Sequence, residues 1–304
     1  MKILLISDKP DWAYATIANA IIRHNDCDDL LFSHIHCKGN QKVIRKKCKQ
    51  FDYYFVLGWQ NYRGLEFLEQ KRTLVGIHSH QSFDGRKTTV EQDISPDDKV
   101  VEHLSGFRSI NVVSKRLQRI FEQRGVSVIY TPNGVDSQKF CPATRPLSEF
   151  IVGSAGSLKN DWNKGVESFI RPACIRAGVE LQTVRIGQHQ IRHTEMPSFY
   201  QSLTCYVCAS LSEGMSLSIL EAASAGCIVL STKCGDIEQL IVDGSTGYFI
   251  DRDVDSICSK LQKIKDDPVK SIEISCQIRQ SIQREWDWQY RIRCWIDFVK
   301  SSVL

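Results

Sequence analysis

The sequence predicts an α/β protein of two domains, each built on a parallel β-sheet with helices on both faces. The chain has 304 residues, more than one domain usually holds and enough for two. Short apolar runs, which indicate buried strands, alternate with apolar residues at helical spacing, and this order is typical of parallel sheets. The stretch from Cys141 to Pro146 holds two prolines and lacks apolar periodicity, so we expect the linker there.

The linker sets the expected boundaries. Residues 1–145 form the first domain, residues 146–285 the second, and residues 286–304 a C-terminal helix. In the first domain the apolar runs predict strands at 2–7, 30–34, 53–57, 74–77, 109–114 and 126–130, with helices at 13–21 and 117–121. In the second domain we expect strands at 150–156, 181–186, 206–209 and 228–231, with helices at 166–173, 254–264 and 272–288. The polar, aperiodic stretch 81–105 predicts a loop.

The composition is that of a globular protein that does not bind nucleic acid. Apolar residues make up 42% of the chain and charged residues 24%, and the formal net charge at pH 7 is a mild +4. Nucleic-acid binding usually needs a clustered basic face. The longest basic run, Lys42 to Lys49, is better explained as a solvated helix face.

The pattern of apolar residues and cysteines predicts a cytoplasmic location. No window of about 20 apolar residues exists, which argues against a membrane span. The N-terminal run reads as a first strand rather than a signal peptide. The 12 cysteines are scattered through expected strands and helices, as in a reduced intracellular chain. The tail from Trp286 is rich in aromatics and arginine, so peripheral association with the inner membrane face is an alternative for that segment.

We expect no metal site. Cys205 and Cys208 form the one Cys-x-x-Cys pair, but residues three apart in a strand point to opposite faces. His34 and His36 share a face if extended, as do His78 and His80, yet two histidines without a further ligand make a poor zinc signature. Buried structural cysteines and hydrogen-bonded histidines are the simpler explanation.

The stretch from Ser210 to Gly226 carries the functional prediction. It follows an apolar strand and leads into a helix expected to begin near Ser216. The N–H groups of residues 215–218 would then have no partner within the helix, and such a positive tip binds phosphate. Glu213 and Glu221 stand at either end with seven residues between them. Carboxylates accept hydrogen bonds from sugar hydroxyls, so the pattern suits a nucleotide-diphosphate sugar.

This stretch resembles the Glu-x7-Glu motif of the retaining glycosyltransferases of family four, also called glycosyl transferases group 1. The resemblance continues through residues 222–231, 235–240 and 243–250, and residues 131–136 with Phe140 resemble the segment that closes the first domain of the family. Without this context, Glu213 and Glu221 would be read as two ordinary solvated carboxylates.

The resemblance implies a GT-B fold, in which two Rossmann-like domains face one another across a cleft. It implies that the first domain binds an acceptor, that the second binds a nucleotide sugar, and that the final helix packs back on the first domain. The implied reaction is transfer of a hexose to a hydroxyl of a glycan, a lipid-linked acceptor or a small molecule, with retention and without a metal.

The resemblance also assigns roles to residues of this chain. Lys164, followed by Gly165, matches the lysine that reaches the donor diphosphate, and His78 matches a histidine that faces the donor sugar. We therefore expect His78, Lys164 and Glu213 to be the catalytic residues. The expected donor-binding residues are Gly214, Met215, Ser216, Leu217 and Glu221. In these roles Glu213 orients the hexose hydroxyls and Glu221 the ribose.

Two departures from the family pattern keep other functions open. Pro10 and Trp12 stand where the family has a glycine-rich loop, and Ser157 stands where it commonly has an arginine. These departures favour the alternative of a non-catalytic glycosyltransferase-like subunit that binds a nucleotide sugar or scaffolds a partner. A sugar-nucleotide epimerase of similar architecture is a third reading, which the context of the motif fits less well.

Overall fold

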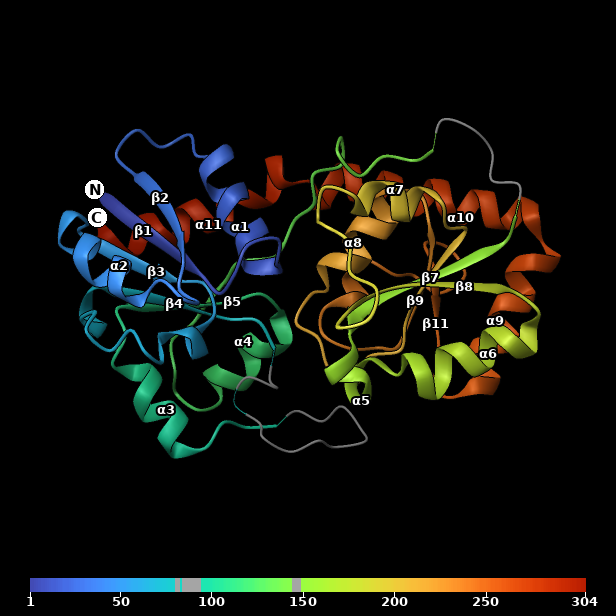
Figure 1. Ribbon diagram of the computed structural model, residues 1–304, viewed down its shortest axis with the longest axis horizontal. Coiled ribbons are helices and arrows are strands. Elements are labelled where there is room, and N and C mark those ends of the chain that lie inside the picture. Colours follow the sequence, from blue (N-terminus) through green and yellow to red (C-terminus); the bar gives the residue numbers. More distant parts are fainter. Residues whose placement is uncertain (80–82, 84–93, 144–148) are drawn as a thin grey trace. The chain divides into compact units, whose positions relative to one another are not determined.

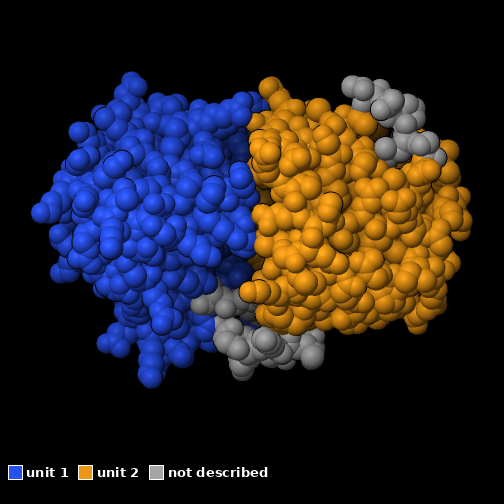
Figure 2. Space-filling view, viewed as in Figure 1, with its two compact units in different colours: residues 1–86, 92–133, 288–304 blue, residues 87–91, 134–287 orange. Residues whose placement is uncertain are grey.

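The computed structural model describes residues 1–79, 83, 94–143 and 149–304. The chain divides into two compact units, coloured separately in Figure 2. The described residues of unit 1 are 1–79, 83, 94–133 and 288–304, and those of unit 2 are 134–143 and 149–287. The units thus change at residues 134 and 288, whereas the sequence placed the boundaries after 145 and 285.

Unit 1 is built on a six-stranded parallel sheet with the strand order β2-β1-β3-β4-β5-β6. Its strands are β1 (Lys2–Ser7), β2 (Leu31–His36), β3 (Tyr53–Val56), β4 (Thr73–Ile77), β5 (Ser109–Val112) and β6 (Ile129–Tyr130). Every residue of β4 is buried, as expected for a strand covered on both faces. Because all the strands are parallel, their carboxyl ends share one edge, where such sheets bind ligands.

The helices of unit 1 are α1 (Ala13–Arg23), α2 (Gln41–Lys47), α3 (Asp98–Ser105), α4 (Lys115–Glu122) and α11 (Trp288–Val303), shown with the sheet in Figure 1. Helix α3 lies within the stretch predicted to be a loop, so that prediction was wrong for residues 98–105. The Asp97 side chain accepts a hydrogen bond of 2.8 Å from the Val100 N–H and caps this helix, a signal that polar composition concealed.

Helix α11 belongs to unit 1 and packs against α1. Trp295 and Phe298 are buried, and the Trp295 indole N–H donates to the Pro132 carbonyl oxygen at 2.8 Å. The aromatic residues at these two positions therefore contribute to the core of unit 1. Among the described residues, no helix combines the length and apolar character needed to cross a membrane.

Unit 2 is built on a five-stranded parallel sheet with the order β11-β10-β9-β7-β8. Its strands are β7 (Ile151–Ser157), β8 (Glu180–Ile186), β9 (Cys205–Cys208), β10 (Ile228–Ser231) and β11 (Tyr248–Phe249). Side chains of β9 alternate between two cores: Tyr206 and Cys208 join one, Cys205 and Val207 the other. The sheet is therefore covered on both faces.

The helices of unit 2 are α5 (Asp161–Lys164), α6 (Arg171–Ala177), α7 (Met196–Gln201), α8 (Leu217–Ser224), α9 (Val254–Asp266) and α10 (Pro268–Ser281). Two π-helical turns, Val166–Ile170 and Ile282–Trp286, precede α6 and follow α10. Helix α8 packs into the first of the two cores, whereas α6 and α9 pack into the second. The two parallel sheets with helices on both faces confirm the predicted fold class.

Candidate functional site

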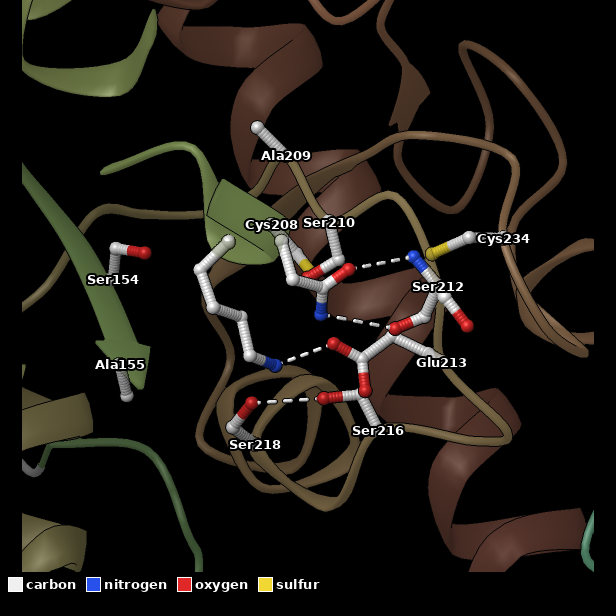
Figure 3. Close-up of polar contacts among 12 residues, drawn as sticks. Ser154, Ala155, Cys208, Ala209, Ser210, Ser212, Glu213, Ser216, Ser218 and Cys234 are labelled. Carbon is white, nitrogen blue, oxygen red and sulfur yellow. Dashed lines mark hydrogen bonds and ion pairs between the residues drawn. The ribbon is translucent and has the colours of Figure 1, made fainter. Parts of the chain in front are cut away.

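Helix α8 begins where the sequence predicted. Ser216 is its N-cap residue and Leu217 its first helical residue. The Ser216 hydroxyl bonds to the Ser218 hydroxyl at 2.9 Å and does not cap the helix, and Figure 3 shows this pair beside Glu213. The first N–H groups of a helix have no partner within it. The start of α8 therefore presents the positive end of the helix dipole, and the side chain of its N-cap residue does not cap it.

Lys164 and Glu213 form an ion pair close to this helix start. Lys164 is the last residue of α5, and Glu213 lies in the loop between β9 and α8. The Lys164 Nζ donates to Glu213 Oε1, and the two side chains are 20% and 17% exposed. Burial, the largest single influence, lowers the pKa of Lys164, but the attraction and hydrogen bond of Glu213, together with the attraction of Cys208 and Tyr206, outweigh burial and raise that pKa above its ordinary value. Lys164 is therefore a fixed cation, and its ammonium has further N–H donors for an anion.

The loop that carries Glu213 is tied to the segment that carries Lys164. The Ser212 N–H donates to Asn163 Oδ1 at 3.0 Å, and Asn163 Nδ2 donates to the Ser212 carbonyl oxygen at 3.2 Å. Arg252 adds a second connection, since its Nε donates to the Ala209 carbonyl at 2.9 Å and its Nη2 to the Trp162 carbonyl at 2.6 Å. These hydrogen bonds to neighbouring backbone atoms thus set the distance between Lys164 and Glu213.

A glycine allows a third segment to support this loop. Gly235 has a φ of +61°, and a Cβ at this position would overlap the Gly214 carbonyl oxygen. That same carbonyl accepts a hydrogen bond of 2.9 Å from the Asp236 N–H. Only glycine permits so close an approach in the left-handed conformation.

Arg185 binds carboxylates on both sides of Lys164 in the sequence. It lies in β8 with its side chain 1% exposed, and its guanidinium donates to Asp161 Oδ1 at 2.6 Å and to Glu167 Oε1 at 2.5 Å. These carboxylates stand three residues before and three residues after Lys164. A buried arginine that binds both flanks restrains the position of the lysine between them.

Glu221 has a separate set of partners. It lies within α8 and is 6% exposed. His193 Nε2 contacts its Oε1 at 2.8 Å, and the Tyr200 hydroxyl donates to its Oε2 at 2.9 Å. The two glutamates of the motif therefore occur in different surroundings, one paired with a cation and the other held by polar side chains.

His78 lies in unit 1, directly after β4. Its ring meets the Tyr14 ring edge-on at 4.7 Å between centroids and lies 6.3 Å from the Trp295 ring. Burial lowers the pKa of His78 to about 4, so the imidazole is neutral near pH 7. Its Nε2 is buried and has no hydrogen-bond partner in the part of the chain that the structure describes. The imidazole is thus held neutral in the interior of unit 1, and its contact with a substrate stays a prediction.

Within the described ranges, no three His, Cys, Asp or Glu side chains come together as metal ligands would. His34 Nε2 and His36 Nδ1 instead share the Ser7 hydroxyl at 2.9 and 2.8 Å. His80, the partner suggested for His78, lies outside the described residues. Cys208 bonds to the Ser210 hydroxyl at 3.3 Å, and a hydrogen bond from the Cys234 thiol lowers the pKa of Cys208.

Solved structures of the GT-B fold match nearly the whole chain. Sucrose-phosphate synthase from Thermosynechococcus elongatus superposes with a TM-score of 0.76, covering 99% of this chain and 98% of that chain at 16% identity. HepE of Anabaena in complex with UDP and glucose superposes with a TM-score of 0.75, covering 99% of this chain and 100% of that chain at 14% identity. This protein therefore has the predicted GT-B fold.

Sequence comparison adds a family-model match within unit 2. Residues 150–267 match the family model described as glycosyl transferases group 1. The glycogen synthase of Mycobacterium tuberculosis (strain CDC 1551 / Oshkosh) is 28% identical over 110 residues, which are 36% of this chain and 26% of that protein. The sucrose synthase of Denitrovibrio acetiphilus is 30% identical over 88 residues, which are 27% of this chain and 11% of that protein. These matches support the predicted relationship to glycosyl transferases of group 1; the narrower assignment to family four stays a prediction.

The structure brings together some of the predicted site residues and separates others. Lys164 and Glu213 are in contact, and Gly214 to Leu217 form the adjacent helix start. Glu221 lies about one helical turn after the first residue of α8 and has partners of its own. Sequence reasoning did not single out Asn163, Arg185, His193 or Tyr200. His193 had one available signal, because it follows β8 at the carboxyl end of a parallel strand, where such sheets bind ligands.

Proposed function

We propose that this protein transfers a hexose from a nucleotide-diphosphate sugar to a hydroxyl acceptor, with retention of anomeric configuration and without a metal. The observation that carries the proposal is the contact of Lys164 with Glu213 at the start of α8, inside the residues that match glycosyl transferases group 1. As the glycosidic bond breaks, the leaving diphosphate gains negative charge. The Lys164 ammonium and the N–H groups at the helix start are fixed donors that can stabilise that charge.

Each predicted residue has a role in this reaction. Lys164 and the N–H groups of Met215 to Leu217 bind the diphosphate, and Gly214 lets the loop approach it. Glu213 accepts hydrogen bonds from the hexose hydroxyls. Glu221 accepts from the ribose, and His78, as a neutral imidazole, hydrogen-bonds near the reacting carbon. Unit 2 is thus the donor-binding part and unit 1 the acceptor-binding part.

A uridine nucleotide is the first donor to test. HepE, whose fold is similar, has been solved in complexes with UDP and with UDP-glucose. UDP-, GDP- and ADP-sugars would each be screened for an increase in melting temperature, because a ligand that binds only the folded state stabilises it. A donor at about 100 times its dissociation constant is expected to add about 2.7 kcal/mol to the free energy of unfolding.

The stabilising donor would then be used to measure turnover by Lys164→Met and Glu213→Gln. We expect Lys164→Met to lower the rate about a hundredfold, the typical loss when one transition-state donor is removed. Glu213→Gln removes the carboxylate that pairs with Lys164 and accepts from the hexose hydroxyls, so we expect it to lower the rate as well. Lys159→Met is the matched control, since Lys159 is an exposed cation five residues before Lys164. Wild-type rates from folded variants would rule out the proposed site. The anomeric configuration of the product, read by NMR, tests retention, and turnover in EDTA tests metal independence.

Release of nucleotide separates the proposal from its alternatives. A transferase without acceptor usually hydrolyses some donor slowly, whereas a non-catalytic binding subunit is stabilised by the donor and releases no nucleoside diphosphate. An epimerase would change the sugar without any acceptor. The departures from the family pattern at Pro10, Trp12 and Ser157 support the alternative of a non-catalytic binding subunit.

A further inference from the structure

Glu221 belongs to a chain of four hydrogen-bonded polar side chains in unit 2. Lys139 Nζ lies 3.1 Å from His193 Nδ1, and His193 Nε2 lies 2.8 Å from Glu221 Oε1. The Tyr200 hydroxyl completes the set at 2.9 Å from Glu221 Oε2. These residues come from separate segments: the stretch after β6, the loop after β8, α7 and α8. They meet at one carboxylate because the fold of unit 2 brings these segments together.

The geometry determines where the protons lie. An ammonium group can only donate, so Lys139 donates to His193 Nδ1. The proton of the neutral imidazole is then on Nε2, which donates to Glu221. Burial and the nearby Glu221 carboxylate raise the pKa of Tyr200, so the phenol keeps its proton and also donates. Glu221 receives one donor on each oxygen.

In this arrangement Glu221 can form further hydrogen bonds only as an acceptor. A carboxylate has about four acceptor sites on its two oxygens, and two of them are used here. What remains on each oxygen can accept a hydrogen bond and cannot donate one. Two acceptor positions side by side on a carboxylate of fixed orientation match two neighbouring hydroxyl groups.

We propose that Lys139, His193 and Tyr200 are positioning residues that hold Glu221 in the orientation that accepts both hydroxyls of a ribose 2′,3′-diol. The consequence is selection for ribonucleotides over 2′-deoxyribonucleotides. This inference rests on the proposed function, in which Glu221 contacts the ribose, and extends it to residues that do not touch the ligand themselves.

The test compares dissociation constants for a nucleoside diphosphate and its 2′-deoxy counterpart by isothermal titration calorimetry. The base is whichever of UDP, GDP or ADP the wild-type protein binds. Loss of a hydrogen bond to a charged group is worth about 1.5–3 kcal/mol, so the wild type should bind the ribonucleotide at least about tenfold more tightly. Tyr200→Phe and His193→Leu should bring this ratio close to one.

Three further variants make the result specific. His193→Gln keeps an amide donor that can face Glu221, so it should restore part of the ratio lost in His193→Leu. His189→Leu alters an exposed histidine of the same loop and should leave the ratio unchanged. Lys139→Met should lower the ratio less than His193→Leu, because it acts one bond further away.

The outcomes separate this inference from the proposed function. A ratio that stays at the wild-type value while both affinities fall equally would mean that Tyr200 and His193 only support the fold, and would overturn the inference. A wild-type protein that binds ribo- and deoxyribonucleotides equally would also overturn it and leave nucleotide binding intact. A wild-type protein that binds no nucleotide at all would overturn the proposed function.

Discussion

Asn163 and Ser212 exchange two hydrogen bonds, at 3.0 and 3.2 Å, that join the residue before Lys164 to the residue before Glu213. Leu211 adds a backbone bond of 2.9 Å to the Asn163 carbonyl. The side chain of Asn163 thus joins two segments much as hydrogen bonds join neighbouring strands of a sheet. The two segments are not strands, and they are far apart in the sequence. Asn163 sets the distance at which the lysine and glutamate meet.

Replacing Asn163 by alanine is expected to loosen the ion pair. The Ser212 N–H and carbonyl would lose their partner in a buried place, which typically lowers the free energy of unfolding by about 1–3 kcal/mol. We also expect weaker nucleotide-sugar binding, because Glu213 and Lys164 would lose their fixed spacing. Chemical denaturation and calorimetric titration measure the two effects. Asn160→Ala, an exposed asparagine in the same segment, is the control, and equal behaviour of the two variants would contradict the prediction.

Gly235→Ala is expected to displace the loop that carries Glu213. An added methyl group would overlap the Gly214 carbonyl oxygen, so the loop must move. Gly178 provides a matched control, because its φ of +62° is similar and nothing lies within 4 Å of the position where its Cβ would be. Both alanines carry the same left-handed strain, of about 1 kcal/mol. Only Gly235→Ala should also reduce donor binding; the same binding loss in both variants would argue against displacement of the loop.

Arg185 is expected to influence diphosphate binding through Lys164. Arg185→Met releases Asp161 and Glu167, and the lysine between them loses its restraint. We expect nucleoside diphosphate affinity to fall about tenfold, the effect of roughly one weakened charged hydrogen bond. In a Lys164→Met background the same change should have no further effect.

Arg171→Met is the control for this cycle, since Arg171 also pairs with Glu167, at 2.7 Å, but is 39% exposed. Surface pairs of this kind contribute little to stability. If the effects of Arg185→Met and Lys164→Met on affinity simply add, Arg185 supports the fold and does not position Lys164.

Two histidines are expected to make the protein less stable as the pH falls. Burial lowers the pKa of His78 from 6.5 to about 4, and burial together with the nearby His36 lowers the pKa of His34 from 6.5 to about 4. Between these values the unfolded chain binds protons that the folded chain does not, so stability is full above pH 6.5 and decreases toward pH 4. Each histidine contributes up to about 1.4 kcal/mol per pH unit.

Denaturant titrations across this pH range measure the effect. His78→Gln should flatten the dependence of unfolding free energy on pH, because its side chain does not titrate. His189→Gln, at an exposed position, should keep the wild-type slope. An unchanged slope in His78→Gln would show that the imidazole is protonated in the folded protein.

The sequence predicted the fold and the start of the helix at the candidate site, because both depend on local patterns. Apolar periodicity located most of the strands, and Ser216 was read correctly as the start of a helix. The Lys164–Glu213 pair was assembled from two residues that the resemblance to glycosyltransferases had each singled out. The loop prediction failed at 98–105, where the Asp97 cap outweighed polar composition.

What the sequence alone determined was the order of elements and the chemistry offered at their ends, since both depend on residues close together in the chain. Only the tertiary structure decided which side chains contact those groups. Asn163 and Ser212 stand 49 residues apart and His193 and Glu221 stand 28 apart. Such pairs form because parallel strands place distant loops at one edge of the sheet, and that placement depends on strand order, which no local pattern records.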